Sequence, residues 1–587
     1  MSTSVTATSE VLRQHAKLSL AHGDIGKAER LLIETLQNAP NDHEALALMA
    51  ELRLRSGGVT DAFHHYVRAV NAAPEVHLYK ERFLDLAGRG VDVVHSDALE
   101  AAVVACLKTP DLAGAVESWA SLLMANPQFR SIVGSANRDP LSLDGELLLR
   151  PLFLEGLKSN VVCDPSFEAF VTQIRFQLLN RFSNEGRFPR AEYFRLASAL
   201  SHYAFFTDFI LEETEYERIP IDELALQIER GKPYNADAIA LFACYRPLYS
   251  LSSAQDIFET FRNAENLSEV VRAQIGDGLS LYQAAAAIPT LAPVVNETSR
   301  NVREQYEAFP YPRWRMLSKR HVVENWRAEE FSQKLEAPLS DRPATILIAG
   351  CGTGRDAAIH AVRFPMASIT AVDVSRASLA YASLKANELG LENLTFVHGD
   401  ILDLGRMYQS FDHICCTGVL HHMEDPVAGW RVLCDLLKPG GLTRIGLYSR
   451  AGRQAVAAAQ DAACRANYPP TRDGLLRFRR DCPRICDAET MLRLSRLQDY
   501  YHLNMYRDLV FPAREHRFDL NQIGDMLRAL GLRFEGFYVS AEVLTKYRSL
   551  FRDDRHATNL ETWRQFESLY PDTFASMYIF WCRKPQT

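Results

Sequence analysis

The chain has 587 residues, 47% of them apolar and 24% charged, and its 65 basic and 73 acidic side chains give a formal net charge of −8. This length predicts three or four domains, and the mild acidity argues against a general affinity for nucleic acids. Because no apolar run reaches the roughly 18 residues of a membrane span and the start lacks the features of a signal peptide, we expect a cytoplasmic protein without a membrane span.

The first 75 residues contain an internal repeat with a period of 34 residues. The equivalent residues are Ala16 and Ala50, Gly23 and Gly57, Ala28 and Ala62, and Pro40 and Pro74. Small residues at these spacings let two antiparallel helices approach closely, glycine opens the turn between them, and proline ends the second helix. The pattern resembles the tetratricopeptide repeat, which implies stacked helical hairpins over residues 1–75.

Residues 76–295 predict an α-helical domain, with degenerate repeats as one interpretation. The apolar residues recur at intervals of three and four, as in residues 167–182, which is typical of amphipathic helices. Stacked repeats form concave surfaces that bind partners. We therefore expect the helical half to recruit a protein, or alternatively to pack only on the rest of the chain or on a second copy in a homodimer.

Residues 296–340 form a segment rich in aromatic residues and prolines. Pro310 and Pro312 force the stretch 309–313 to be extended, so this part is not a simple helix. The aromatic rings around these two prolines are expected to pack against another surface. Two interpretations stay open, a lid and linker over a ligand site, or an interdomain clasp whose rings are ordinary core.

Residues 344–373 predict a strand, a glycine-rich turn, a helix and a second strand that ends in a carboxylate. A helix that starts after such a turn offers free N–H groups to an anionic group. Asp373 lies where an acidic side chain can accept hydrogen bonds from two ribose hydroxyls. The dinucleotide fingerprint would need glycine at position 355, but this residue is Arg355. A nicotinamide or flavin site is therefore kept only as an alternative, and a domain that has lost its cofactor is another.

Further landmarks follow in chain order. Asp400 comes after a third apolar strand, a fourth strand precedes Thr417, and residues 436–449 combine a helix end, a Pro-Gly-Gly turn and a fifth strand. Together with the G-x-G-x-G loop and Asp373, these features resemble the class I S-adenosylmethionine-dependent methyltransferases. The resemblance implies an α/β Rossmann-like domain at 341–587 with a seven-stranded sheet, and S-adenosyl-L-methionine as its cofactor. It implies that the cofactor contacts are Gly350, Cys351, Gly352, Gly354, Asp373, Val374, Asp400, Ile401, Thr417 and His421.

Cys351, inside the glycine loop, is interpreted as a small structural residue and not as a nucleophile. The eleven cysteines of the chain are scattered, which argues against a disulfide framework and against a zinc or other metal site. His421 and His422 are neighbours that cannot easily chelate one ion. We therefore expect His421 to be a structural or cofactor contact.

The chain after the fifth strand contains two insertions, at 449–518 and 540–574, of which the first is expected to cap the substrate side. A short amphipathic helix, a sixth strand and a last apolar strand follow the first insertion. In the methyltransferase family the seventh strand enters antiparallel between the fifth and the sixth. The resemblance therefore implies that the fold closes at the C-terminal strand.

A second resemblance concerns the acceptor. The pattern Q-Y-E-x-x-P-Y-P-R-W at 305–314, with R-D-L-x-F and E-H-x-F within 507–518, is similar to bacterial methyltransferases that carry helical or tetratricopeptide regions, some of which methylate lysines of surface proteins. It implies a lid over the methionine end of the cofactor. The candidate catalytic residues are Tyr311, Glu515 and His516, and the candidate substrate contacts are Tyr306, Trp314 and Arg507.

A lysine acceptor would need help to lose its proton. With a reference pKa near 10.4, only about one lysine in 2,500 is neutral at pH 7. Tyr311 and Trp314 are expected to hold and desolvate the amine, and Glu515 or His516 to accept a proton. The alternative for Glu515, His516 and Arg507 is a hydrogen-bonded buttress that fixes the first insertion against the sheet.

The sequence therefore predicts a methyltransferase with a protein side chain, preferably lysine, as the acceptor. One alternative is a methyltransferase for a small molecule or glycan whose helical half serves dimerisation. Another is a repeat-based adaptor with a cofactor domain that only senses its ligand. A basic stretch at 472–484 is expected to be a solvated face or a contact for an acidic peptide, because the remaining chain is mildly acidic and only Phe478 interrupts the run as a stacking ring.

Overall fold

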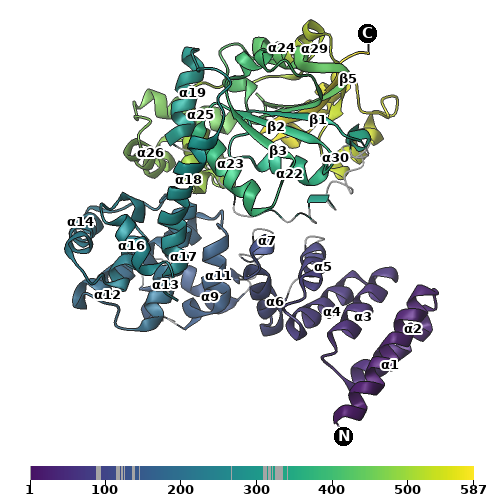
Figure 1. Cartoon of the computed structure of the whole chain (residues 1–587), viewed down its shortest axis with the longest axis vertical. Coiled ribbons are helices and arrows are strands. Elements are labelled where there is room, and N and C mark those ends of the chain that lie inside the picture. The colour runs from purple at the N-terminus through teal and green to yellow at the C-terminus, as the bar shows by residue number, and fades with distance from the viewer. Residues whose placement is uncertain are drawn as a thin grey trace. The chain divides into compact units, whose positions relative to one another are not determined.

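We describe a computed structural model of the chain (Figure 1). It describes all residues except 1, 88–90, 92–93, 114–118, 120–122, 125, 135–138, 144–145, 266, 309–313, 315–316, 318, 320–321, 324–334, 340–341 and 587. The chain forms two compact units. The helical unit comprises residues 1–205, 213–253 and 263–270, and the sheet unit comprises 206–212, 254–262 and 271–587. Among the described residues, no helix is both long and apolar enough to cross a membrane.

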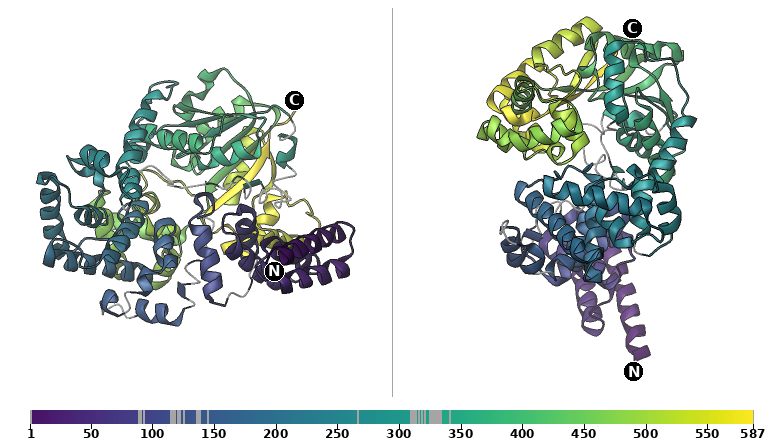
Figure 2. Two further views of the ribbon diagram at one scale, coloured as in Figure 1. Left: turned by 60° about the horizontal axis from the view of Figure 1, so that its bottom comes forward. Right: turned by 90° about the vertical axis from the view of Figure 1, so that its left-hand side faces the viewer.

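The helical unit begins with two helical hairpins, in which α1 and α2 lie side by side (Figure 2). The four helices are α1 (Ser2–Ala21), α2 (Ile25–Asn38), α3 (His43–Arg55) and α4 (Val59–Ala72). Gly23 and Gly57 follow α1 and α3 with φ of 79° and 81°, a conformation that glycine adopts without strain. The four alanines of the repeat are fully buried. The predicted hairpins over residues 2–72 are therefore present.

Shorter and longer helices continue this unit, in agreement with the predicted helical half. They are α5 (His77–Ala87), α6 (Asp97–Leu107), α7 (Pro110–Ala113), α9 (Pro127–Val133), α10 (Pro140–Leu143), η1 (Leu147–Leu149), α11 (Pro151–Ser159), α12 (Pro165–Glu185), α13 (Ala191–Phe206), α14 (Glu215–Arg230), α15 (Ala236–Phe242), η2 (Leu248–Ser250) and α17 (Ser268–Val271).

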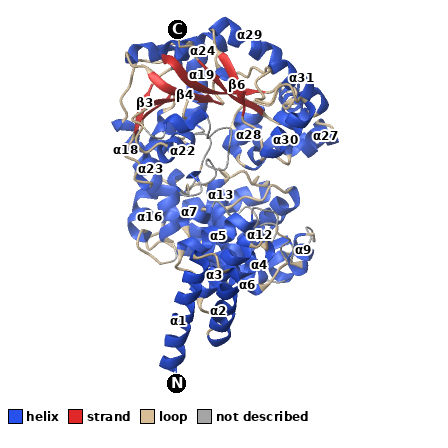
Figure 3. Ribbon diagram, turned by 90° about the vertical axis from the view of Figure 1, so that its right-hand side faces the viewer, coloured by secondary structure: helices blue, strands red, loops and turns tan. Residues whose placement is uncertain are grey.

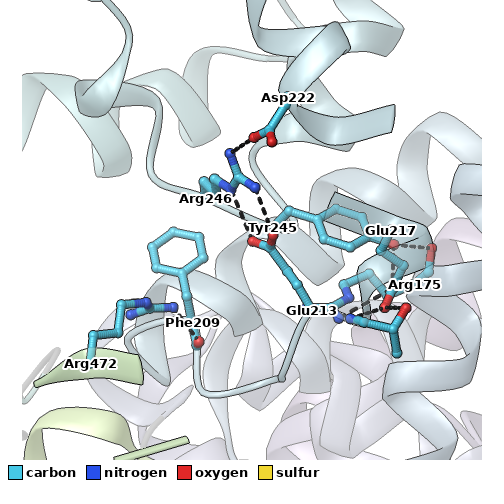
Figure 4. A network of polar contacts seen from close by, with 9 residues as sticks. Arg175, Phe209, Glu213, Glu217, Asp222, Tyr245, Arg246 and Arg472 are labelled. Atoms are coloured by element: carbon cyan, nitrogen blue, oxygen red, sulfur yellow. Dashed lines mark hydrogen bonds and ion pairs between the residues drawn. The ribbon is translucent and has the colours of Figure 1, made fainter. Parts of the chain in front are cut away.

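A buried ion pair joins two of these helices and contacts the turn after α15 (Figure 4). Arg175 of α12 lies 3.2 Å from Glu217 of α14, and both side chains are only 1% exposed. The Tyr245 hydroxyl donates to the same carboxylate at 2.8 Å, and the guanidinium lies 4.1 Å from the centre of the Tyr245 ring. Each charge is thus compensated inside the core.

Replacing Glu217 by alanine should destabilise the helical unit strongly, because the Arg175 charge would stay buried without its partner. We expect the free energy of unfolding to fall by about 3–5 kcal/mol in urea denaturation followed by circular dichroism. Glu185→Ala is the control, since its ion pair with Arg187 is exposed, and it should change stability by less than about 1 kcal/mol. Equal effects of the two substitutions would contradict this account.

The sheet unit contains a seven-stranded sheet with the order β3-β2-β1-β4-β5-β7-β6, drawn in red in Figure 3. The strands are β1 (Thr345–Ala349), β2 (Ser368–Asp373), β3 (Leu394–His398), β4 (Phe411–Thr417), β5 (Leu437–Tyr448), β6 (Arg533–Phe537) and β7 (Met577–Arg583). The first five strands are parallel, and β7 enters antiparallel between β5 and β6. The predicted Rossmann-like fold and the position of its last strand are confirmed.

Alternate residues of each strand pack on opposite faces of the sheet. Ile346 and Ile348 of β1 lie on the face of the sheet that is covered by α22 (Arg355–Arg363) and α23 (Arg376–Glu388). Leu347 and its neighbours on β4 and β5 contact the other face, covered by α24 (Pro426–Leu436) and α29 (Leu520–Leu530). Both faces are therefore buried, as expected for parallel strands.

The remaining elements of the sheet unit lie before β1, directly after β3 and β4, and within the two predicted insertions. They are α16 (Ala254–Phe261), η3 (Arg272–Gly276), α18 (Asp277–Ala287), α19 (Glu297–Ala308), η4 (Ala337–Leu339), η5 (Ile401–Met407), η6 (Leu420–His422), α25 (Gln454–Arg465), α26 (Arg472–Ile485), α27 (Ala488–Leu494), η7 (Gln498–Tyr501), α28 (Leu503–Val510), α30 (Ala541–Leu550), α31 (Leu560–Leu569) and η8 (Pro571–Phe574).

The basic stretch of α26 is engaged within the sheet unit. Arg472 donates to the backbone carbonyls of Asp208 and Phe209 at 3.1 and 2.7 Å, the latter visible in Figure 4. Arg480 pairs with Glu212 at 2.8 Å. Part of this charge is thus used to hold residues 206–212 against the first insertion.

Candidate functional site

A cavity of about 500 Å³ lies at the carboxyl ends of the parallel strands. Ligands of open α/β sheets bind at this edge. Eight of the ten residues predicted to contact the cofactor line the cavity, namely Gly350, Cys351, Gly352, Asp373, Val374, Asp400, Ile401 and Thr417. They come from the ends of β1, β2, β3 and β4, so strand order brings together residues that are up to 67 positions apart (350 to 417).

The glycine loop after β1 leaves no room for side chains at two of its positions. Gly350 has a φ of 71°, and a Cβ atom there would lie 2.3 Å from the side chain of Val419. Gly354 has a φ of 80°, and its Cβ would lie 2.4 Å from that of Ala382 on α23. Gly354 therefore serves close packing at the start of α22, and it is not part of the cavity lining.

We expect Gly350→Ala to weaken cofactor binding. The added methyl group needs both a strained φ and a shift of Val419, so the affinity for S-adenosylmethionine should fall about tenfold or more, or about 1.4 kcal/mol, in calorimetry. Gly390→Ala is a matched control, because Gly390 has a φ of 60° with nothing within 4 Å of the added atom. An unchanged affinity in Gly350→Ala would show that the loop does not contact the ligand.

Asp373 connects the end of β2 with the glycine loop. Its Oδ2 accepts a hydrogen bond from the Gly352 N–H at 2.7 Å, and its Oδ1 accepts one from the Ser375 N–H at 2.9 Å. Burial raises the pKa of Asp373 to about 6, although these two N–H groups favour the charged form. The carboxylate lines the cavity and has lone pairs left for further donors.

Two tyrosine side chains also line the cavity. Tyr306 of α19 and Tyr448 at the end of β5 both line it. The Tyr306 hydroxyl donates to Asp508 Oδ1 at 2.7 Å, and Gln305 donates to the same oxygen at 3.1 Å. Asp508 is 4% exposed. A buried carboxylate thus stands directly behind a tyrosine hydroxyl of the cavity wall.

A second carboxylate lies near the first. Burial, and next the charge of Asp508, raise the pKa of Asp499 in η7 to about 6. Burial and the same Asp508 charge also raise the pKa of Tyr448. Two carboxylates and two tyrosines therefore lie close together here, with the Arg453 guanidinium 3.5 Å from the centre of the Tyr448 ring.

Arg507, the predicted substrate contact, and Asp508 are neighbours in the pattern R-D-L-x-F. Arg507 is held by its own helix end, where it donates to the Phe511 carbonyl, and it is not part of the cavity lining. Asp508 is the next residue of α28, and adjacent residues of a helix point about 100° apart. The signal that could have found Asp508 is its burial next to a cavity tyrosine, which the sequence does not display.

Glu515 and His516 lie behind the cavity wall. Glu515 pairs with Arg453 at 2.8 Å, with both side chains at most 3% exposed, and the Arg453 guanidinium lies 3.5 Å from the centre of the Tyr448 ring. His516 Nε2 is 3.1 Å from the Met423 carbonyl oxygen. These contacts fit the buttress interpretation, and neither Glu515 nor His516 is among the residues that line the cavity.

Trp314 also takes a structural position. Its Nε1 donates to the Thr353 carbonyl at 2.8 Å, and its ring packs with Leu317, Ala358 and Leu389. The ring is 6% exposed. These contacts fit the clasp interpretation for Trp314, which is not part of the cavity lining. Tyr311 lies outside the described residues.

The two histidines after β4 and Cys351 have different surroundings. His422 lines the cavity, with Nδ1 2.6 Å from the Arg514 carbonyl oxygen. His421 is fully buried and stacks on the Tyr448 ring with centroids 3.7 Å apart, so it supports the wall from behind. Burial raises the pKa of the Cys351 thiol well above its ordinary value, which agrees with a structural residue.

The residues of the cavity fit S-adenosylmethionine. The carboxylate of Asp373 matches the two hydroxyls of a ribose, the loop without side chains allows close approach of a ligand, and the tyrosine rings suit a cation such as a sulfonium. A dinucleotide would need the third glycine at the position of Arg355. The donor set of the cavity therefore favours the sulfonium cofactor.

Comparison with known proteins agrees with this geometry. Residues 346–441 match the family described as "Methyltransferase domain". An uncharacterised protein of Synechococcus sp., syc1184_c, is 31% identical over 276 residues, which cover 44% of this chain and 63% of that protein. A trans-aconitate 2-methyltransferase of Deinococcus radiodurans is 36% identical over 115 residues, or 19% of this chain and 42% of the enzyme. The chain thus spans less than two thirds of either relative.

Among solved structures, PKMT2 from Rickettsia typhi in complex with AdoHcy is similar with 15% identity and a TM-score of 0.31, over 51% of this chain and 54% of that one. This likeness is too low to carry any argument about substrates. The family match and the cavity it surrounds are sufficient for the class of the domain. The sheet unit contains an S-adenosylmethionine-dependent methyltransferase domain.

Proposed function

We propose that the whole protein transfers the methyl group of S-adenosylmethionine to an amine, preferably the side chain of a lysine in a protein. The observation that carries the proposal is the pairing of Tyr306 with the buried carboxylate of Asp508 at the cavity wall. An aromatic ring whose hydroxyl is backed by a buried carboxylate suits the binding of an ammonium group.

The strand order supports one orientation of the bound cofactor along the edge of the sheet. Asp373 ends β2 and Asp400 follows β3, so ribose and adenine belong on that side. Tyr448 ends β5, on the other side of β1 and β4. The methyl end of a bound cofactor is therefore expected near Thr417 and Tyr448, next to the tyrosine and carboxylate cluster.

The bound cofactor supplies an electrophilic methyl group and a good leaving group. The side chains of the cluster supply position and a proton acceptor, which matters because a lysine amine is mostly protonated at neutral pH. In this proposal the Tyr306 oxygen accepts a proton from the lysine ammonium group while the Tyr306 hydroxyl passes its own proton to Asp508, which leaves a neutral amine. The amine lone pair is then free to form the new C–N bond.

The helical unit supports a protein as the acceptor. Stacked helical hairpins of this kind, which resemble tetratricopeptide repeats, bind extended segments of other polypeptides. We include the recruitment of the substrate by this unit in the proposal. Dimerisation through the same hairpins, with a small molecule or glycan as acceptor, is the competing outcome of the experiment below.

The experiment is transfer of a radiolabelled methyl group into a cell lysate. Labelled protein bands that are absent with Asp373→Ala, and whose label maps to lysine by mass spectrometry, would support the proposal. Label confined to the small-molecule fraction would refute a protein acceptor. Cofactor binding without any transfer to lysate would instead favour the sensing adaptor.

A further inference from the structure

Three side chains of metal-ligand type meet between α22 and β4, and none of them lines the cavity. They are His360 of α22 and His413 and Cys415 of β4, all fully buried. His360 Nε2 lies 3.2 Å from Cys415 Sγ, and His413 Nε2 lies 3.0 Å from the same sulfur. The two β4 residues face the same side because they are two positions apart on a strand.

The other nitrogen of each ring fixes its tautomer. His360 Nδ1 is 2.8 Å from the Asp356 carbonyl oxygen, and His413 Nδ1 is 3.0 Å from the Leu442 carbonyl oxygen. A carbonyl oxygen only accepts, so each Nδ1 carries the hydrogen of its neutral ring. Both Nε2 atoms are therefore left with lone pairs, and both lone pairs are directed at one thiol.

The cluster has too few hydrogen atoms for all of its contacts to be hydrogen bonds. Two neutral rings and one thiol supply three hydrogens, whereas two Nδ1 contacts and two Nε2 contacts require four. The thiol can donate to only one Nε2, so the other contact places two lone-pair atoms against each other. A cation shared by the sulfur and both nitrogens removes this conflict. A second proton on one ring would also do so, with the buried Glu336 carboxylate 4.0 Å from His413 Nε2 as its counter-charge, and the metal content distinguishes the two.

We propose that His360, His413 and Cys415 bind a zinc ion, with Glu336 as a fourth ligand. Two imidazole nitrogens and a thiolate are a donor set that zinc takes. Glu336 is fully buried; its Oε1 lies 4.0 Å from His413 Nε2 and accepts from Trp581 Nε1 at 3.2 Å, and its Oε2 lies 3.8 Å from Arg363 Nη1, so Glu336 would have to move toward the ion to become a ligand. The hydrogen bonds from both Nδ1 atoms to carbonyls are the outer contacts that orient metal-binding histidines.

The site needs only a small opening to accept the ion. Tetrahedral zinc, with bonds of about 2.3 Å to sulfur and about 2.1 Å to nitrogen, separates these atoms by about 3.6 Å. The two nitrogen–sulfur distances here are 3.0 and 3.2 Å, so each would lengthen by roughly half an ångström. On binding, the Cys415 thiol loses its proton to solvent and forms the zinc–sulfur bond.

The ion would join a helix to the centre of the sheet. The helix is α22, which begins directly after Gly354 of the glycine loop. Zinc would thus fix the helix that follows the cofactor loop, as a structural ion away from the reacting atoms. This role does not depend on the acceptor of the methyl group.

The test is the metal content of the full chain, purified without a histidine tag and exposed to zinc, measured by elemental mass spectrometry. We expect about one zinc per chain, and less than about 0.1 in Cys415→Ser and His413→Asn. Cys416→Ser is the matched control, because Cys416 is the next residue of β4, is equally buried and contacts the opposite face of the sheet. It should retain the ion.

If the variants fail to fold, as judged by circular dichroism, a second measurement on the wild-type chain tests the proposal. Cobalt added to the wild-type chain should give the absorption of a cobalt–thiolate bond, as is typical of a site with a cysteine ligand. Less than about 0.1 zinc per wild-type chain without a cobalt–thiolate absorption would overturn the proposal and favour a protonated histidine cluster. Full zinc content in a folded Cys415→Ser would also overturn it.

Discussion

Replacing Asp373 by alanine is expected to abolish methyl transfer through loss of the cofactor. The carboxylate offers lone pairs to two ribose hydroxyls and holds the glycine loop through the Gly352 N–H. Hydrogen bonds to a charged group contribute about 1.5–3 kcal/mol each, so the affinity for S-adenosylmethionine should fall at least about 100-fold in calorimetry.

The control for this substitution is Asp403→Ala. Asp403 is a residue of η5 after β3 that pairs with Arg406 at 2.9 Å and is not among the residues lining the cavity, so its removal should leave cofactor affinity unchanged. If Asp373→Ala binds the cofactor within about threefold of the wild type, the ribose assignment is wrong.

The same carboxylate predicts a pH dependence. Its pKa of about 6 means that it is charged above this pH and takes up a proton below it. A protonated carboxyl accepts fewer hydrogen bonds, so cofactor affinity should fall as the pH is lowered from about 7.5 to about 5. In Asp373→Asn the affinity should be weak at every pH in this range. A wild-type affinity that does not change would contradict the assignment.

The second large effect is expected from Asp508→Asn. The amide keeps the size of the side chain and can still accept from the Tyr306 hydroxyl, but it cannot take up a proton. The turnover number should fall by about 10²–10⁴, the range for a lost proton acceptor, while cofactor affinity stays at the wild-type value. Single-turnover assays with the identified acceptor measure this difference.

Tyr306→Phe gives an independent check, since it keeps the ring and removes the hydroxyl. If both residues act in one proton path, the double variant should be no slower than the slower single variant. Asp525→Asn is the control, and we expect it to leave the turnover number unchanged because Asp525 belongs to an exposed ion pair. Full turnover in Asp508→Asn would exclude Asp508 as the proton acceptor.

The glycine loop and its carboxylate could be predicted from the sequence because their signals are local. Alternation of apolar strands with helices fixes a parallel sheet, and a parallel sheet places every strand end at one edge. The place of Asp373 and Asp400 at the cavity could therefore be predicted without knowledge of contacts between distant segments. The helical hairpins were predictable for the same reason, since the period of 34 residues repeats a local unit.

The acceptor end depends on contacts between segments that are about 200 residues apart, and the sequence does not encode these visibly. Tyr306 and Asp508 meet only because α19 and α28 pack together. Trp314 looked like a channel residue because aromatic rings are common there, yet its indole N–H found a partner in the loop backbone. The zinc ligands were missed because His360 is 53 residues from His413, far outside the spacings of known zinc motifs.

A crystal structure of the chain with S-adenosylhomocysteine tests the central claim most directly. The account predicts the ribose hydroxyls within hydrogen-bond distance of Asp373, the adenine beside Asp400 and Ile401, and the sulfur on the side of Tyr306 and Tyr448. A ligand bound elsewhere, or bound in this cavity with its ribose away from Asp373, would contradict it.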